Sequence, residues 1–251
     1  MEQMKSRVGK EFMQKTKYQY LGQSDQAREL PQPPLEKPLE AGKPLVELPR
    51  PGHWQVPGAD LALTITARVS VRHYLEKPLS LEELAYLLWC TQGVKTVTAR
   101  PVTLRTVPSA GARHPLETYL LVNNVEGVLP GVYRYAAIDH GLVQLTTGPG
   151  LGDQFARACL NQRFVGLSAV AFFWAADAYR CIWRYGERGY RYMHLDAGHV
   201  CQNLYLAAMS IGCGCCAVGA YDDDAVNSLL GLDGEDNFVI YAAAVGKRPG
   251  P

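Results

Sequence analysis

The sequence lacks the features of a membrane-spanning or exported protein, and it has little net charge. Its first twelve residues, MEQMKSRVGKEF, are charged throughout and contain no apolar stretch of the kind found in signal peptides. No later segment reaches the roughly 18 uninterrupted apolar residues that a spanning helix needs. Lysine and arginine total 25 against 24 acidic residues, so there is no broad basic field for nucleic acid or an anionic membrane. We therefore expect a cytoplasmic protein with neither partner.

Two patterns that would indicate other prosthetic groups are also missing. No Gly-x-Gly-x-x-Gly loop follows a predicted strand, which argues against a dinucleotide pyrophosphate. The seven cysteines are odd in number and lie mostly in apolar segments, as in a reducing compartment. Cys213, Cys215 and Cys216 lie close together and could suggest a metal or redox site. Because Cys-x-x-Cys and paired-histidine spacings are absent, we favour small buried residues and predict no metal.

The composition divides the chain into two parts. Residues 1–58 are polar and rich in proline, and prolines interrupt both helices and strand ladders, so we predict an N-terminal arm. From Leu61 onward apolar segments alternate with turn signals, which indicates one core domain over residues 59–251. Neither internal repeats nor low-complexity tracts interrupt it.

The core domain contains both helix and strand signals. Ser80 and Glu83 form a predicted capping box for a helix over 81–92, and Asp222 can cap a helix that Gly231 ends. A long helix is predicted over 196–211, where His199 has a packing or interface role. Strands are predicted over 118–122, 132–135, 142–145, 169–175, 215–219 and 238–245. Strict strand–helix alternation is absent, so the predicted fold class is α+β.

A short basic segment precedes the first core helix. In an extended conformation Arg68, Ser70 and Arg72 point to one side, which suits a phosphate group. A solvated basic edge explains the same residues. Lys247 and Arg248 follow the last predicted strand and form a second basic pair, with a charged terminus as the plainer interpretation.

Two further segments are rich in small residues that let a ligand approach the backbone. Pro108 and Ser109 open the first, and Gly111 lies at its centre. Val218, Gly219 and Ala220 form the second, at the end of a predicted strand. Ordinary turns would account for either segment alone. The stretch from Tyr179 to Tyr192 is unusually aromatic and basic, and it either lines a substrate channel or forms a packed lid.

Taken together and in this order, five motifs resemble the SagB-type dehydrogenases of the nitroreductase superfamily. They lie in residues 68–74, 108–115, 131–135, 196–204 and 218–223. The resemblance covers about residues 60–248, and the Thr16-Lys17-Tyr18 triplet with the proline-rich arm resembles the N-terminal extension of that branch.

The resemblance implies a nitroreductase-like α+β fold, with helices around a mostly antiparallel sheet, in a homodimer that binds two FMN molecules. It places the FMN phosphate and ribityl chain on Arg68, Ser70 and Arg72, with Lys247 or Arg248 closing the phosphate site. It also places the 108–111 loop beside the isoalloxazine ring, and the turn from Val218 to Ala220 at flavin N5.

The sequence departs from the family pattern at two points. Ala112 stands where many nitroreductases have an asparagine that contacts the flavin. Arg184 and Tyr185 stand where azoline-oxidising relatives carry a Lys-Tyr pair for proton removal, and arginine is a poor general base. We therefore expect FMN-dependent, NADH- or NADPH-linked reduction of an electron-poor small molecule. A SagB-type peptide dehydrogenase, a non-catalytic flavin-binding scaffold and a dehalogenating or flavin-degrading relative are the alternatives.

Overall fold

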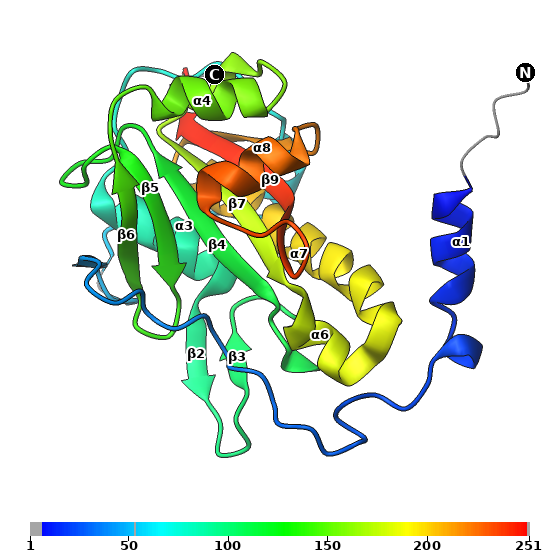
Figure 1. Cartoon of the computed structure of the whole chain (residues 1–251). Coiled ribbons are helices and arrows are strands. Elements are labelled where there is room, and N and C mark those ends of the chain that lie inside the picture. Colours follow the sequence, from blue (N-terminus) through cyan, green and yellow to red (C-terminus); the bar gives the residue numbers. More distant parts are fainter. Residues whose placement is uncertain (1–6, 53, 250–251) are drawn as a thin grey trace, which may run out of the picture.

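The computed structural model describes residues 7–52 and 54–249, and a seven-stranded antiparallel sheet forms its centre (Figure 1). The strand order is β1-β6-β5-β4-β7-β9-β8, and every neighbouring pair is antiparallel. The strands are β1 (Leu45–Glu47), β4 (Leu116–Val122), β5 (Gly131–Ala136), β6 (Gly141–Thr147), β7 (Val170–Asp177), β8 (Cys213–Val218) and β9 (Asn237–Lys247). A separate hairpin joins β2 (Val94–Val97) to β3 (Thr103–Arg105).

Helices cover both faces of this sheet. On one face lie α3 (Leu81–Gln92) and α7 (Gly189–Ser210), while α4 (Leu151–Ala158), α5 (Arg163–Leu167) and α8 (Asp223–Leu230) cover the other. Side chains that alternate along a strand serve the two layers, so Phe172 packs toward α3 and α7 while Phe173 packs toward α4. The α+β class predicted from the sequence is confirmed.

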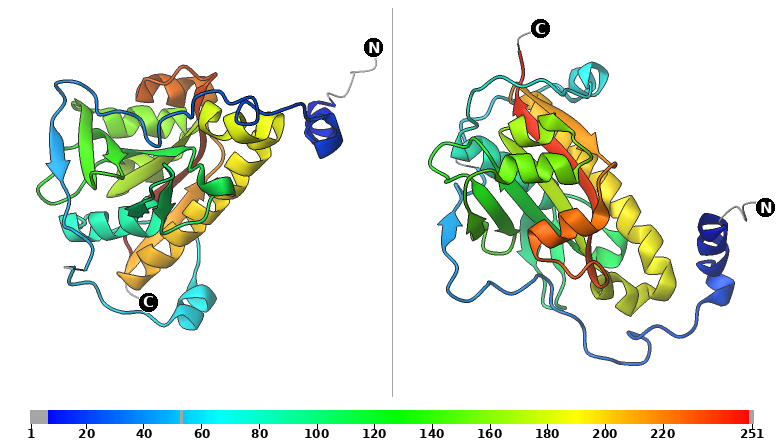
Figure 2. Two further views of the ribbon diagram at one scale, coloured as in Figure 1. Left: turned by 90° about the horizontal axis from the view of Figure 1, so that it is seen from below. Right: turned by 45° about the horizontal axis from the view of Figure 1, so that its top comes forward.

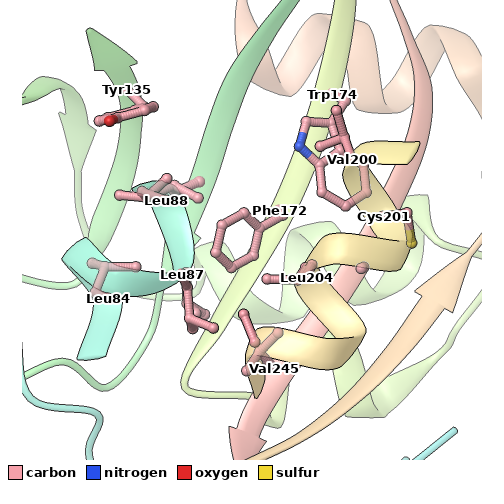
Figure 3. Close-up of a cluster of buried hydrophobic side chains, with 14 of the residues drawn as sticks. Leu84, Leu87, Leu88, Tyr135, Phe172, Trp174, Val200, Cys201, Leu204 and Val245 are labelled. Atoms are coloured by element: carbon pink, nitrogen blue, oxygen red, sulfur yellow. The ribbon is translucent and has the colours of Figure 1, made fainter. Parts of the chain in front are cut away.

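The larger core lies between the sheet and the helices α3 and α7. Figure 3 shows Leu84, Leu87 and Leu88 of α3 facing Phe172 of β7, with Leu204 of α7 beside them. All five side chains are fully buried. At about 25 cal/mol per Å² of apolar area, each contributes roughly 1.5–3 kcal/mol, which stabilises the packing of α3 and α7 against the sheet.

The capping signals in the sequence are reproduced. Ser80 and Glu83 form a reciprocal capping box at the start of α3, and the Asp222 side chain accepts a hydrogen bond from the backbone of Ala225. The predicted long helix exists, but α7 begins seven residues earlier than predicted, at Gly189. The preceding helix α6 (Ala178–Tyr185) was missed, although Asp177 caps it.

The arm differs from the prediction that its prolines exclude regular structure. It contains α1 (Val8–Lys15), a 3-10 turn at Tyr18–Tyr20 and the strand β1, which pairs with β6 at the edge of the main sheet. Pro44 and Pro49 flank β1, and an edge strand tolerates such neighbours because one side of its ladder stays open. Leu48, just after β1, is buried in the larger core, so the core begins before Leu61.

One helix stands away from the body of the domain. The helix α2 (Leu61–Ala67) has no buried residue, and both views in Figure 2 show it standing off the sheet and its covering helices. Leu61, Leu63 and Ile65 on α2 are 64%, 69% and 53% exposed.

Within the described ranges, no helix is long and apolar enough to cross a membrane.

Candidate flavin site

The segment Arg68–Arg72 runs along the edge strand β8. The backbone N–H of Val71 donates to the carbonyl of Cys215 at 2.9 Å, and Ser70 forms a parallel bridge to Cys215. Gly214 permits this close approach, because a Cβ there would overlap the side chain of Val71. The segment is therefore locally extended at Ser70, as the basic motif requires.

Tyr205 of α7 organises one side of this segment. Its hydroxyl lies 2.9 Å from Ser70 Oγ and accepts a hydrogen bond from the backbone N–H of Ala217 at 2.8 Å. The guanidinium of Arg68 stacks on the Tyr205 ring, 5.2 Å from its centre. Sequence reasoning did not identify Tyr205, which lies nine residues after the start of the predicted long helix.

Arg72 does not share these contacts. It is exposed and lies 6.0 Å from the ring centre of Phe164, which belongs to α5 in the layer on the opposite side of the sheet. The predicted common direction of the three side chains therefore holds for Arg68 and Ser70 at Tyr205, while Arg72 lies across the edge strand from them.

The C-terminal basic pair lies beside the first residue of β8. Lys247 is opposite Cys213 in the sheet and forms an ion pair with Glu83, the capping-box residue of α3. Arg248 donates to the sulfur of Met209 at 3.5 Å. Met209 is one helical turn after Tyr205, so Arg248 and Arg68 contact the same face of α7. Within residues 7–52 and 54–249, no carboxylate lies within 4 Å of Arg68, Arg72 or Arg248.

The small-residue loop after Pro108 has a strained backbone. Gly111, Ala112 and His114 have φ angles of 57°, 51° and 44°, in the left-handed region that residues with a Cβ rarely adopt. Pro108 is exposed, while Ser109 Oγ donates to Asp196 at 2.5 Å and accepts from the backbone of His114 at 2.9 Å. Backbone strain of this kind is frequent at functional sites, where the surroundings hold it in place.

The loop lies against Arg184 and Tyr185 at the end of α6. A Cβ on Gly111 would overlap the phenol oxygen of Tyr185 and would lie 3.0 Å from Arg184 Nε. The structure thus brings together the predicted loop and the Arg184-Tyr185 pair, which stands at the catalytic position of the azoline-oxidising relatives. Burial raises the pKa of the Tyr185 phenol, and the neighbouring charge of Arg184 opposes that rise.

Residues of the N-terminal arm pack beside Tyr185 and the helix that follows it. Tyr18 lies 2.7 Å from the hydroxyl of Tyr192, and its ring lies under the guanidinium of Arg188 at 4.2 Å. The rings of Tyr192 and Tyr185 are in edge contact, 4.8 Å between centres. Arg188 also donates to the carbonyl of Thr16 at 2.9 Å. The aromatic and basic stretch is therefore packed, and the Thr16-Lys17-Tyr18 triplet forms part of the packing.

The remaining predicted residues lie at the end of β8. Val218 is buried in the smaller core, whereas Gly219 and Ala220 are exposed directly after it. The Ala220 carbonyl accepts from the Gln162 side chain at 2.7 Å, which fixes this turn. Exposed backbone at the end of a rigid strand can offer fixed hydrogen-bonding groups to a ligand.

The predicted residues therefore form two groups along α7. One group meets α7 at Tyr205, and the other meets it at Asp196, nine residues earlier. At 3.6 residues and 5.4 Å per turn, nine residues correspond to about 14 Å and roughly half a rotation of the helix. Within one chain the basic group and the small-residue loop thus lie on opposite faces of α7.

The cysteine cluster is buried. Cys213, Cys215 and Cys216 are each at most 1% exposed, and burial raises the pKa of all three thiols. In the part of the chain that the structure describes, no group of three or more histidine, cysteine or acidic residues could hold a metal ion.

Comparison with known proteins identifies the family to which this fold belongs. The nitroreductase family matches residues 65–247. A Methanocaldococcus jannaschii protein assigned to the nitroreductases is 40% identical over 163 residues, which are 65% of this chain and 80% of that protein. The trifolitoxin-processing protein TfxB of Rhizobium leguminosarum bv. trifolii is 33% identical over 133 residues, 51% of this chain.

A solved Anabaena variabilis structure, likewise assigned to the nitroreductases, superposes with a TM-score of 0.64 at 32% identity. The superposition covers 76% of this chain. The chain spans 36% of the length of TfxB and 38% of the Anabaena chain, so both of these proteins are considerably longer than the matched region.

Proposed function

The chain belongs to the nitroreductase family, and from that membership we propose that it is an FMN-dependent oxidoreductase. The observation that carries the proposal is the pair of guanidinium groups on one face of α7, Arg68 and Arg248, with Arg72 across the edge strand from them. None of the three has a carboxylate partner among the described residues. Uncompensated arginines held on rigid elements are the donors that a phosphate dianion requires.

The residues present fit FMN. Arg68 and Ser70 share Tyr205 as a support, and Arg248 lies one turn away on the same helix face, which gives the phosphate and ribityl chain donors from two segments. Lys247 is already paired with Glu83, so we assign phosphate contact to Arg248 and a supporting role to Lys247. Gly219 and Ala220 present exposed backbone for the flavin ring.

We further propose a homodimer in which each flavin is held by both chains. The basic group and the Ser109–Gly111 loop lie on opposite faces of α7, so one chain would have difficulty presenting both to one FMN. A second copy can supply the loop. Two exposed apolar features support such an association: α2 with its three exposed leucine and isoleucine side chains, and Leu195 on α7, which is 60% exposed.

Bound FMN would supply two-electron chemistry, with hydride exchanged at its N5 atom. The protein's own part is to bind and orient. The guanidinium groups would hold the phosphate end, the Val218–Ala220 turn would offer backbone groups to the ring, and the strained loop would let the ring approach small residues. NADH or NADPH is the proposed electron donor.

The acceptor side is formed by Arg184, Tyr185 and the arm. A base that removes a proton from carbon works best with a pKa near the ambient pH, whereas burial raises the pKa of Tyr185 above its usual value of about 10. Arg184 suits an anionic group instead. We therefore favour reduction of an electron-poor molecule, with a substrate carboxylate or phosphate bound by Arg184.

A second candidate is a SagB-type dehydrogenase that acts on a modified peptide. The similarity to the trifolitoxin-processing protein TfxB favours it, as do the arm motif at Thr16–Tyr18 and its position beside Tyr185. A flavin-binding scaffold without turnover is the third candidate.

We place the protein in the cytoplasm, which agrees with seven cysteines that are all free thiols.

Purification followed by anaerobic titration tests these candidates. We expect a yellow protein whose released cofactor has the mass of FMN, and whose flavin is bleached by NADH or NADPH and then reoxidised by a quinone. A cofactor with the mass of FAD, or a colourless protein that does not bind added FMN, would refute the flavin assignment. Bound FMN that no nicotinamide bleaches and no peptide reduces would favour the scaffold.

A further inference from the structure

Asp196 is a buried carboxylate that lacks a cationic partner. Its side chain lies on α7 in a residue that is 5% exposed, and no lysine, arginine or histidine nitrogen of the described chain lies within 4 Å of it. Oδ2 accepts from Ser109 Oγ at 2.5 Å and Oδ1 accepts from the backbone N–H of Ala110 at 3.2 Å. The space between it, the loop and α3 is too small for a water molecule.

Such a charge costs the fold stability. Removing a carboxylate from water without a counter-ion is unfavourable, and two hydrogen bonds compensate only in part. Burial accordingly raises the pKa of Asp196, while the hydrogen bonds from Ser109 and Ala110 and the nearby His199 oppose the rise. A neutral asparagine could accept from Ala110 with its carbonyl oxygen and donate its amide N–H to Ser109 Oγ, because a hydroxyl can accept as well as donate. The packing of this loop therefore needs a polar acceptor at position 196, but it does not need a negative charge.

The contacts of Asp196 indicate where its charge acts. Both go to Ser109 and Ala110, the start of the strained loop that, in the function proposed above, lies beside the isoalloxazine ring. Resting on that function, we propose that Asp196 is a positioning residue that fixes this loop and, through its buried charge, lowers the reduction potential of the flavin. A negative charge in a water-free site disfavours the electron-rich reduced ring relative to the oxidised ring.

The substitution Asp196→Asn tests the charge separately from the shape. We expect reduced FMN to bind about tenfold more tightly relative to oxidised FMN than in the wild type, which for two electrons raises the midpoint potential by about 30 mV. Equilibration with a reference dye measures this potential without any turnover. The apoprotein of this variant should also unfold at a higher denaturant concentration than the wild type at neutral pH, because the buried charge is gone.

Three control variants separate charge from loop damage. Ser109→Ala disturbs the loop but keeps the carboxylate, so it should not raise the potential. Asp196→Glu keeps the charge and should stay near the wild-type potential. Glu47→Gln removes an exposed charge on β1, the edge strand opposite β8, and it should leave both potential and stability unchanged. Equal rises of the midpoint potential in Ser109→Ala and Asp196→Asn would overturn the proposal.

The outcomes distinguish this inference from the proposed function. If the wild type binds FMN and Asp196→Asn leaves the potential unchanged or lowers it, the inference is wrong and the function stands. If the wild type binds no flavin, both are wrong. Should Asp196→Asn fail to fold, Asp196→Ser replaces it, because its hydroxyl is also neutral and can accept from Ala110, and the same rise is expected.

Discussion

Gly111 and Tyr185 are packed so closely that a single methyl group on the glycine would overlap the phenol oxygen. The contact links the loop proposed to lie beside the flavin to the residue proposed to face the acceptor. A change at Gly111 therefore displaces Tyr185, and a change at Tyr185 alters the space available to the loop.

The substitution Gly111→Ala should destabilise the protein by about 1–3 kcal/mol, since the φ of 57° is unfavourable for alanine and the new methyl group meets Tyr185. Urea unfolding measures the loss. The double variant Gly111→Ala, Tyr185→Phe removes the oxygen that the methyl overlaps and should recover part of it. No recovery would mean that the backbone strain alone accounts for the loss.

The substitution Arg68→Ala should weaken FMN binding about tenfold or more, because it removes a charge-assisted contact worth roughly 1.5–3 kcal/mol. Fluorescence titration of the apoprotein with FMN gives the dissociation constant. Arg100→Ala is the matched control, since Arg100 is an exposed arginine in the β2–β3 hairpin turn, far from β8. Equal affinities for the wild type and Arg68→Ala would exclude Arg68 from the site.

The substitution Leu195→Glu should dissociate the proposed dimer and release flavin together with it. The new carboxylate would lie on the outer face of α7, where the second copy is expected to pack. Sedimentation velocity measures the assembly state, and absorbance at the flavin band measures occupancy. Leu129→Glu alters an equally exposed leucine in the turn before β5 and should leave the dimer intact. A stable, flavin-loaded wild-type monomer would contradict the prediction.

The carboxyl of Glu36 gives the arm a pH-dependent attachment. Burial is the main reason that its pKa rises to about 7, and the nearby Glu117 adds to the effect. Between about pH 4.5 and 7 the folded protein keeps a proton on Glu36 that the unfolded chain releases. The contribution of Glu36 to the free energy of unfolding therefore falls as pH rises through that window. Glu36→Gln should gain stability over the wild type at pH 8 and lose that gain at about pH 5. A gain that does not depend on pH would argue against the ionisation.

Reduction of an electron-poor acceptor should be preferred to desaturation of a neutral ring. Under nitrogen, the reduced enzyme should be reoxidised quickly by quinones or nitroaromatics, whereas thiazoline-containing peptides should bleach the oxidised flavin slowly, because Tyr185 is a weak base. Rapid bleaching by the peptide that is lost in Tyr185→Phe and kept in Arg184→Ala would reverse this preference and restore the azoline-oxidising function.

Much of the fold could be predicted because the signals were local. The capping box at Ser80, the cap at Asp222 and the apolar strand over 169–175 each depend on residues within one element, and each is present. The strand β1 could not be foreseen in the same way. Only three residues long and flanked by prolines, it is held by hydrogen bonds to β6, about a hundred residues later in the sequence.

The sequence indicated which segments form the candidate site, but not how these segments are arranged in space. The residues Ser109, Gly111 and Tyr185 do come together, yet no local pattern indicates that Asp196 lies under the loop or that Tyr205 supports Arg68. The buried guanidinium of Arg134 illustrates the same limit, because its partner Glu40 belongs to the arm and lies 94 positions earlier. Contacts between distant segments depend on the tertiary fold, which composition and periodicity do not specify.

The arm also has a consequence for the order of events during synthesis. Thr16 is bound by Arg188, 172 positions later, so the arm leaves the ribosome long before the surface that receives it exists. At roughly 5–20 residues per second, that delay is on the order of 10–30 s. The packing around Tyr185 can therefore be completed only after α7 has folded.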